Sequence, residues 1–272
     1  MRWGAIGVAA ALVAAWLSAS ATAAAQETGQ WTAGAPMPSA RSEVAAAEFD
    51  GKIYVVGGFG AAPAEIEIYD PAEDSWSRGA AIPRPVHHPA AVGFGGKLLV
   101  FGGYAGGWTP TDAVQEYDPA TDSWRALAQM PTPRGALAAV VLGERVHLVG
   151  GSGEGGNSPA HEVYDPATDA WTAHAPLPTP RDHLTAAAVD GRLYAIGGRV
   201  NGSYANNLAA NEVYDPAADR WEARAPMPTA RSGIAAAVLG GRMFVFGGEA
   251  LAGTFNQTQA YDARSNGWSS HA

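Results

Sequence analysis

Short apolar segments recur along the chain, and each ends at a pair of glycines. The pairs begin at positions 57, 102, 150, 197 and 247, and the residues before them are rich in Val, Ile, Leu, Tyr and Phe. Turn-forming residues such as Asp50-Gly51 precede these segments. No stretch has the sustained apolar period of 3.6 residues that a core-facing helix requires. The pattern predicts short strands joined by tight turns, and no helices.

Aromatic residues repeat in the same rhythm. Tyr-Asp pairs begin at 69, 117, 164, 214 and 261, and a tryptophan follows each aspartate after six residues. Counted from Trp31, the tryptophans of this series are 45, 48, 47, 50 and 47 residues apart, which is typical of repeat arrays. One period, residues 134–174, contains four short strand-like segments separated by hairpin-type turns. Four antiparallel strands per repeat, arranged radially, predict an all-β propeller.

The repeated motif resembles a known family. Gly-Gly after a strand, then Tyr-Asp-Pro-Ala-Thr-Asp-x-Trp (164–171) and Met-Pro-Thr-x-Arg (130–134), resembles the kelch repeat from about Trp31 to Trp268. The resemblance implies a kelch-type β-propeller. It leaves the function open, because kelch propellers serve as protein-binding modules, sugar-active enzymes and copper oxidases.

Five complete repeats are expected within a propeller of residues 26–272. They cover residues 41–79, 86–127, 134–174, 181–224 and 231–271, and an extra closing strand is expected at 29–34. Kelch-like rings usually close when an N-terminal strand completes the last blade. Two interpretations remain: a six-bladed ring that lacks part of one blade, or a five-bladed ring with a spare strand. We favour the first, because an open sheet edge invites unwanted pairing.

The first residues have the three parts of a secretory signal peptide, predicted for residues 1–25. A basic start (1–2) is followed by an apolar run (5–17) and by small residues (18–25). Cleavage after position 23 and cleavage after position 25 both fit, and an uncleaved anchor is the alternative. We expect export to the periplasm or the outside, with no membrane span after cleavage.

Composition narrows the function classes. The chain has 17 Lys+Arg, 26 Asp+Glu and no cysteine, with a pI of about 5.2. The acidic balance argues against nucleic acid as a partner. The lack of cysteine excludes disulfides, thiolate nucleophiles, and the copper site of the galactose-oxidase family, which needs a Cys cross-linked to Tyr. We expect a monomer with no cofactor and no metal.

Segment lengths point to one face of the ring. Three of the four segments in each repeat keep a constant length, and only the segment between the glycine pair and the Tyr-Asp pair varies, from 11 to 16 residues. This b–c loop and the d–a loop between repeats emerge on the same face of an up-and-down blade. Recognition usually lies in variable loops on a rigid scaffold, so we place the site there.

Two kinds of residue are candidates on this face. Four repeats begin with an arginine, which suits either a carboxylate-binding ring or a framework that pairs neighbouring blades. The repeat starts that depart from this pattern carry histidines and acids instead. The catalytic candidates are Arg181, Asp182, His183 and Glu43, and the ligand-binding candidates are Arg41, His87, His88, Tyr104, Trp108, Arg134, Arg181, His183, Arg199, Tyr204, Arg231 and Glu249.

Three further histidines are interpreted as structural. His147 replaces an aromatic residue in a core strand, so we expect it to be packed. His161 and His174 have no metal partner at ligand spacing.

Two functions fit these residues. The first is an extracytoplasmic module that binds a protein or a glycan through the b–c loop face. The alternative is a sugar-active enzyme that resembles the N-acetylneuraminate epimerases, which interconvert sialic acid anomers. That chemistry needs an arginine for the carboxylate and an acid/base pair of His, Glu or Asp.

Overall fold

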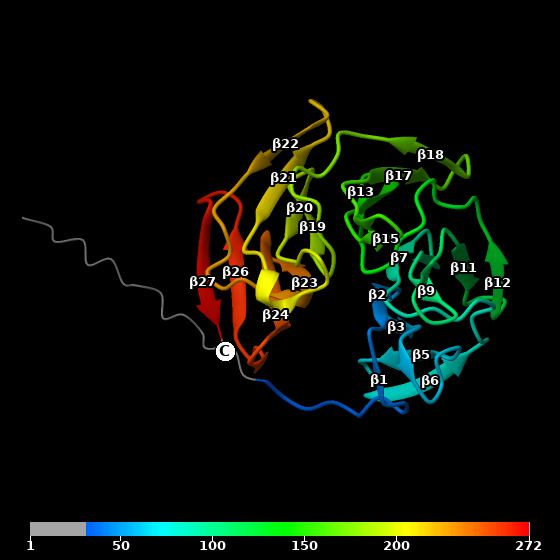
Figure 1. Ribbon diagram of the computed structural model, residues 1–272. Coiled ribbons are helices and arrows are strands. Elements are labelled where there is room, and N and C mark those ends of the chain that lie inside the picture. The colour runs from blue at the N-terminus through cyan, green and yellow to red at the C-terminus, as the bar shows by residue number, and fades with distance from the viewer. Residues whose placement is uncertain (1–30, 272) are drawn as a thin grey trace, which may run out of the picture.

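A computed structural model describes residues 31–271, in which five four-stranded antiparallel sheets stand around a central axis (Figure 1). The predicted signal peptide (1–25) and the first residues of the predicted closing strand lie outside the described part. One short 3-10 helix, η1 (Tyr204–Asn206), is the only helical element between residues 31 and 271. The prediction of an all-β propeller with five complete blades is confirmed.

The strands of each blade follow one another in sequence. Blade 1 contains β2 (Ala45–Phe49), β3 (Lys52–Val56), β5 (Ile66–Asp70) and β6 (Ser75–Gly79). Blade 2 contains β7 (Ala90–Phe94), β8 (Lys97–Phe101), β11 (Val114–Asp118) and β12 (Ser123–Ala126). Blade 3 contains β13 (Ala138–Leu142), β14 (Arg145–Val149), β17 (His161–Asp165) and β18 (Ala170–Ala173).

Blade 4 contains β19 (Thr185–Val189), β20 (Arg192–Ile196), β21 (Asn211–Asp215) and β22 (Arg220–Ala223). Blade 5 contains β23 (Ser232–Leu239), β24 (Arg242–Ala250), β26 (Thr258–Asp262) and β27 (Gly267–His271). Seven two-residue strands lie in the loops: β1 (Arg41–Ser42), β4 (Phe59–Gly60), β9 (Tyr104–Ala105), β10 (Thr109–Pro110), β15 (Ser152–Gly153), β16 (Gly156–Asn157) and β25 (Gly253–Thr254). The first strands of successive blades contact one another around the channel.

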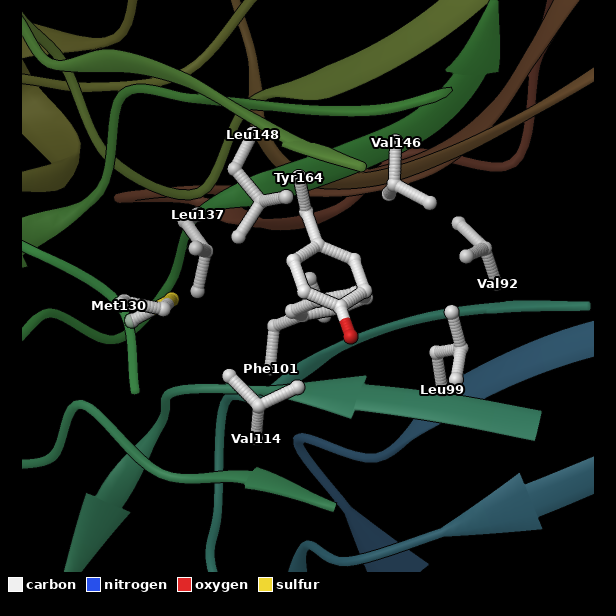
Figure 2. Close-up of a cluster of buried hydrophobic side chains, with 10 residues drawn as sticks. Val92, Leu99, Phe101, Val114, Met130, Leu137, Val146, Leu148 and Tyr164 are labelled. Atoms are coloured by element: carbon white, nitrogen blue, oxygen red, sulfur yellow. The ribbon is translucent and has the colours of Figure 1, made fainter. Parts of the chain in front are cut away.

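The hydrophobic core lies between the blades. Four apolar clusters fill the four junctions between consecutive blades. Figure 2 shows the cluster between blades 2 and 3, where Tyr164 of β17 lies among Phe101, Val114 and Leu148. Full burial of each such side chain contributes about 1.5–3 kcal/mol. This explains why the repeat keeps large apolar residues at these positions.

The Tyr-Asp-…-Trp motif forms a set of hydrogen bonds, here called the latch, between each blade and the segment before it. In blade 3, the Tyr164 hydroxyl donates to Asp169, which also accepts from the backbone N–H of Ala128. The Trp171 indole N–H donates to the carbonyl of the same Ala128 at 3.0 Å. Equivalent bonds recur in the other blades, with Asn266 in place of the aspartate in blade 5. The repeated aromatic residues therefore hold neighbouring repeats in register.

The glycine pairs let the chain approach the next blade closely. Gly57 and Gly58 have φ of 74° and 92°, in the left-handed region that favours glycine. A Cβ on Gly57 would lie 2.6 Å from the carbonyl oxygen of Val86 in blade 2. The N–H of Gly58 donates to that oxygen at 2.9 Å, so the pair forms an interblade contact.

The segment of residues 31–40 runs from the last blade to the first (Figure 1). Trp31 packs edge-on against Phe246 of β24, with ring centroids 5.9 Å apart. Four residues later, Ala35 takes the latch position on Trp76 of blade 1. Residues 31–34 form no strand, so the predicted closing strand is wrong over its described part. A hydrogen-bonded latch and a ring contact span this junction instead.

Candidate functional site

A cavity of about 360 Å³ lies at the mouth of the channel, on the face of the d–a and b–c loops. Every blade contributes to its wall. The lining residues are Ser42, Glu43, Val44, His88, Pro89, Ala136, Leu137, His183, Leu184, Gly233, Ile234, Ala235 and Glu249. Four ionisable side chains, one each from blades 1, 2, 4 and 5, therefore converge on one small volume.

The wall is built on one repeated backbone position. Glu43, His88, Ala136, His183 and Gly233 are equivalent in the five repeats, and their φ values are 55°, 55°, 53°, 52° and 62°. The N–H groups of the last four each donate 2.9 Å bonds to the carbonyl of the equivalent residue one blade earlier. We call these five residues the left-handed ring. It belongs to the scaffold, because alanine and glycine occupy it as well as glutamate and histidine.

The d–a and b–c loops lie on the same face, as predicted. The start of each repeat pairs antiparallel with its own b–c loop at the same register. The pairs are Ser42 with Phe59, His87 with Tyr104, Gly135 with Ser152, Asp182 with Arg199, and Ser232 with Glu249. This pairing brings Arg199 and Glu249 from the loops to the mouth of the channel.

One hydrogen-bonded chain runs from Gly107 through two histidines to Glu43. His87 Nε2 lies 2.6 Å from the carbonyl oxygen of Gly107, and His87 Nδ1 lies 2.6 Å from His88 Nδ1. At the end of the chain, His88 Nε2 lies 3.1 Å from Glu43 Oε2. The His88 side chain is only 4% exposed, whereas that of Glu43 is 29% exposed and reaches the cavity.

A second network surrounds His183. Its Nδ1 lies 2.5 Å from Asp182 Oδ1, and the other Asp182 oxygen accepts from Asn157. Arg199 donates from one nitrogen to His183 Nε2 at 2.8 Å, and another of its nitrogens lies 3.1 Å from a Glu249 oxygen. Three blades thus contribute to one nearly buried ionic network beside the cavity.

Burial sets the protonation of this site. It lowers the pKa of His88 to about 3, with help from nearby His183, His87 and Arg199. Burial also raises the pKa of Glu43, and the negative charge of Glu249 adds to this effect, while His183 and Arg199 oppose it. Near neutral pH, the imidazole of His88 is therefore uncharged.

The repeated arginines lie inside their blades rather than at the cavity. Arg134, Arg181 and Arg231 are 0% exposed, and the guanidinium of Arg41 is buried as well. Arg41, Arg134 and Arg181 pair with Glu67, Glu162 and Glu212 of the same repeat, whereas Arg231 donates to the carbonyls of Gly247 and Gln257. Their guanidinium groups do not line the cavity, so the interpretation as a carboxylate-binding ring needs correction. The framework interpretation holds in part. The side-chain ion pairs lie within each repeat, whereas the backbone carbonyls of Arg134, Arg181 and Arg231 accept from glycines of the preceding blade. Arg181 is therefore not placed to act as a catalytic residue, because its side chain is buried within the blade and does not line the cavity.

The aromatic candidates gather at the rim above His87. Phe59 stacks on His87 with centroids 3.9 Å apart, and Trp108 lies 4.8 Å from the same ring. Trp108 is 65% exposed, while Tyr104 is buried and donates to the carbonyl of Ser152. On the other side, Tyr204 packs over the guanidinium of Arg199 and is 42% exposed. Phe59, an aromatic residue of the first b–c loop, belongs to this rim as well.

A second histidine cluster lies away from the cavity. His147 Nδ1 and His161 Nε2 are 2.9 Å apart, and the His174 ring lies 5.6 Å from that of His161. His147 is buried, as predicted. The meeting of the three is not evident from sequence, because it depends on the register of β14 against β17 across a loop.

The part of the chain that the structure describes contains no helix with the length and apolar character of a membrane span. No curated protein matches this sequence significantly. The solved structure of YjhT superposes with a TM-score of 0.78 at 18% identity, covering 91% of this chain and 89% of that one, which shows a shared fold. A family model described as the Attractin/LZTR1 beta-propeller matches residues 20–250. With its five kelch-type repeats, the chain belongs to the Attractin/LZTR1 β-propeller family.

Proposed function

We propose that this protein is exported and binds a glycan or a sugar-like small molecule at the mouth of its channel. The cavity carries this proposal, because every blade lines it and four ionisable side chains converge there. A concave site of a few hundred Å³ with a few convergent polar groups is typical of small-molecule binding. The leader-like residues 1–25 support export.

The rim supports a sugar rather than an apolar ligand. Exposed Phe59, Trp108 and Tyr204 offer flat rings beside a polar cavity. Such rings pack on the apolar face of a sugar, while the carboxylates of Glu43 and Glu249 accept bonds from its hydroxyls. A protein partner on the same loop face is the competing outcome.

Ligand-observed NMR tests this proposal with a panel of reducing sugars and sialic acids. We expect line broadening with the mature protein and about tenfold weaker binding for Trp108→Ala, because a well-placed aromatic contributes about 1–3 kcal/mol. Leu239→Ala is the matched control, since Leu239 is 72% exposed and ends β23 on the opposite face. No broadening by the folded protein, or equal loss in both variants, would contradict sugar binding here.

A second candidate function is the interconversion of sugar anomers. Glu43 and Glu249 line one cavity, so one carboxyl group is placed to protonate the ring oxygen while the other takes the proton of the anomeric hydroxyl. The ring opens, and the reverse transfers close it on the other face of the carbonyl. The resemblance to N-acetylneuraminate epimerases supports this candidate.

Exchange spectroscopy of the same samples measures the anomeric rate. Catalysis predicts acceleration by the wild type and loss of most of it in both Glu43→Gln and Glu249→Gln. Binding without acceleration leaves a glycan-binding module. Export has a separate readout. The secreted protein should have the mass of the chain without residues 1–23 or without residues 1–25, and a mass that includes the whole of residues 1–25 contradicts cleavage.

A further inference from the structure

Three side chains of the cavity present possible metal ligands to one point. Glu43, His88 and His183 each offer one ligand atom, and these atoms all lie within 4.8 Å of one another. The three residues come from blades 1, 2 and 4 and share the left-handed ring, so the scaffold fixes their backbones. Both imidazoles are more than nine-tenths buried, with side chains 4% and 9% exposed.

The hydrogen bonds of His88 determine which of its nitrogens carries the proton. His87 Nε2 faces a carbonyl oxygen, so it carries a proton and leaves His87 Nδ1 as an acceptor. His88 Nδ1 must then donate to His87 Nδ1, which leaves a lone pair on His88 Nε2. That lone pair faces the Glu43 carboxyl group at 3.1 Å. Two acceptors face each other, and a cation or a shared proton must lie between them.

His183 has the same arrangement. Its Nδ1 donates to Asp182, and Asp182 is held in turn by Asn157. The lone pair is therefore on Nε2, where Arg199 donates to it at 2.8 Å. Metal-binding histidines almost always donate their other N–H to a carboxylate or to another fixed acceptor. Both histidines are oriented in this way before any metal binds.

We propose that Glu43, His88 and His183 bind a Zn²⁺ ion at the channel mouth. Two histidines and one glutamate form a known zinc ligand set that leaves a fourth position open to water or to a bound molecule. The open position faces the cavity. This departs from the expectation, drawn from the sequence, that the protein binds no metal.

Binding requires two rearrangements. Zinc ligands lie about 2.1 Å from the ion, so a tetrahedral set has ligand atoms about 3.4 Å apart and the three side chains must close in. Arg199 must leave His183 Nε2. It has partners ready, because its guanidinium already lies 3.1 Å from Glu249 and 3.5 Å from Asp182.

Calorimetric titration of tag-free, chelator-treated protein with Zn²⁺ tests the proposal. We expect one equivalent to bind, and at least 100-fold weaker binding in His88→Ala and in His183→Ala. His174→Ala is the matched control, because His174 lies in the other histidine cluster and is 27% exposed. Asp182→Asn keeps the ligands but loses the carboxylate, so affinity should fall about 10–100-fold. Circular dichroism verifies that each variant is folded.

Substitution with Co²⁺ gives an independent signature. A four-coordinate site predicts visible absorption that saturates at one equivalent and disappears when Zn²⁺ is added. No binding by the folded wild type, or unchanged binding in His88→Ala or His183→Ala, would overturn the proposal. The inference does not rest on the proposed function, because metal binding is measured without a sugar.

Discussion

Two histidine clusters lie in this ring, and they differ in what faces each imidazole. In the cavity cluster (His87, His88 and His183), the hydrogen-bonded chain ends at the carboxyl group of Glu43. In the distal cluster (His147, His161 and His174), His161 Nδ1 donates to the carbonyl of Ala175 and Nε2 accepts from His147. The distal chain thus ends at His147 Nε2, and among residues 31–271 no carboxylate contacts this nitrogen. His174 lies outside this chain, with its Nδ1 3.3 Å from Asp219.

The two clusters also differ in where their members come from. Blades 2 and 4 supply the cavity histidines and blade 1 supplies the acid. Of these residues, Glu43, His88 and His183 occupy equivalent positions of the repeat. The distal histidines belong to one repeat and pack against Tyr214 and Trp221 of the next. A buried histidine is therefore a weak sign of a site by itself. A lone pair that faces an acid across a cavity is a stronger one.

The largest expected effect is a loss of stability when a histidine of the distal cluster is removed. His161→Ala removes a 2%-exposed ring and two hydrogen bonds, so it should lower the free energy of unfolding by about 2–4 kcal/mol and leave binding at the cavity intact. His183→Ala also removes two hydrogen bonds, to Asp182 and Arg199, and should cost about 1–3 kcal/mol, while ligand or zinc binding is lost. Urea titration measures the stability of both variants, and calorimetry measures their binding. Loss of cavity binding in His161→Ala would contradict the distinction.

Acidic pH should lower the free energy of unfolding, in part through the histidines of the distal cluster. Burial lowers the pKa of His147 to about 3 and that of His161 to about 4, with nearby His174, Arg145 and Arg134 adding to the shift and Asp219 opposing it at His161. The unfolded chain binds these protons near pH 6.5, so stability present above that pH falls as the pH drops towards 3–4.

His147→Leu tests this pH dependence. The equivalent residue in blade 2 is Leu99, so leucine fits the repeat at this position. The variant should lose about 1–2 kcal/mol less than the wild type between pH 8 and pH 5. Urea titrations at the two pH values measure the difference. An unchanged difference would mean that His147 does not titrate on unfolding in this range.

The smallest effect concerns the hydroxyl beside the distal cluster. Tyr214→Phe removes bonds to Asp219 and His174 at 2.7 and 3.0 Å and should cost about 1 kcal/mol. Tyr69→Phe is the matched change in blade 1, where the hydroxyl makes a more exposed bond to Asp74, and its cost should be smaller. Thermal unfolding of both variants measures this, and a reversed order would contradict the assigned burial.

Most of the fold and part of the candidate site could be predicted from the sequence. Period, glycine pairs and aromatic positions predicted the strands, and departures from the repeat at Glu43, His88 and His183 pointed to the cavity. The closing strand was predicted because Trp31 resembles the latch tryptophans in its spacing, but this ring packs on Phe246 and the backbone of residues 31–34 forms no strand.

The sequence contains a pattern that indicates the burial of the repeated arginines. Repeats 1, 3 and 4 have both the arginine and a glutamate in the third strand, whereas repeat 2 has Val86 with Gln115. The joint loss of both charges in repeat 2 indicates an ion pair inside the blades of repeats 1, 3 and 4, whereas repeat 5 keeps Arg231 with Gln259 and has no such pair. The tautomers of the histidines and the contact among the distal histidines could not be predicted from the sequence. Both depend on strand register and on the distance between blades, which composition and residue spacing do not show.

The left-handed ring determines which residues can replace one another at the site during evolution. Its backbone is held by N–H and carbonyl groups that every amino acid except proline can supply. The scaffold therefore accepts different side chains at these five positions, provided that the residue tolerates a φ of 52–62°. In this chain blades 3 and 5 hold alanine and glycine at these positions. Ala136 lies between His88 and His183 in the ring, and its small side chain leaves these two imidazoles in contact, with ring centroids 4.9 Å apart.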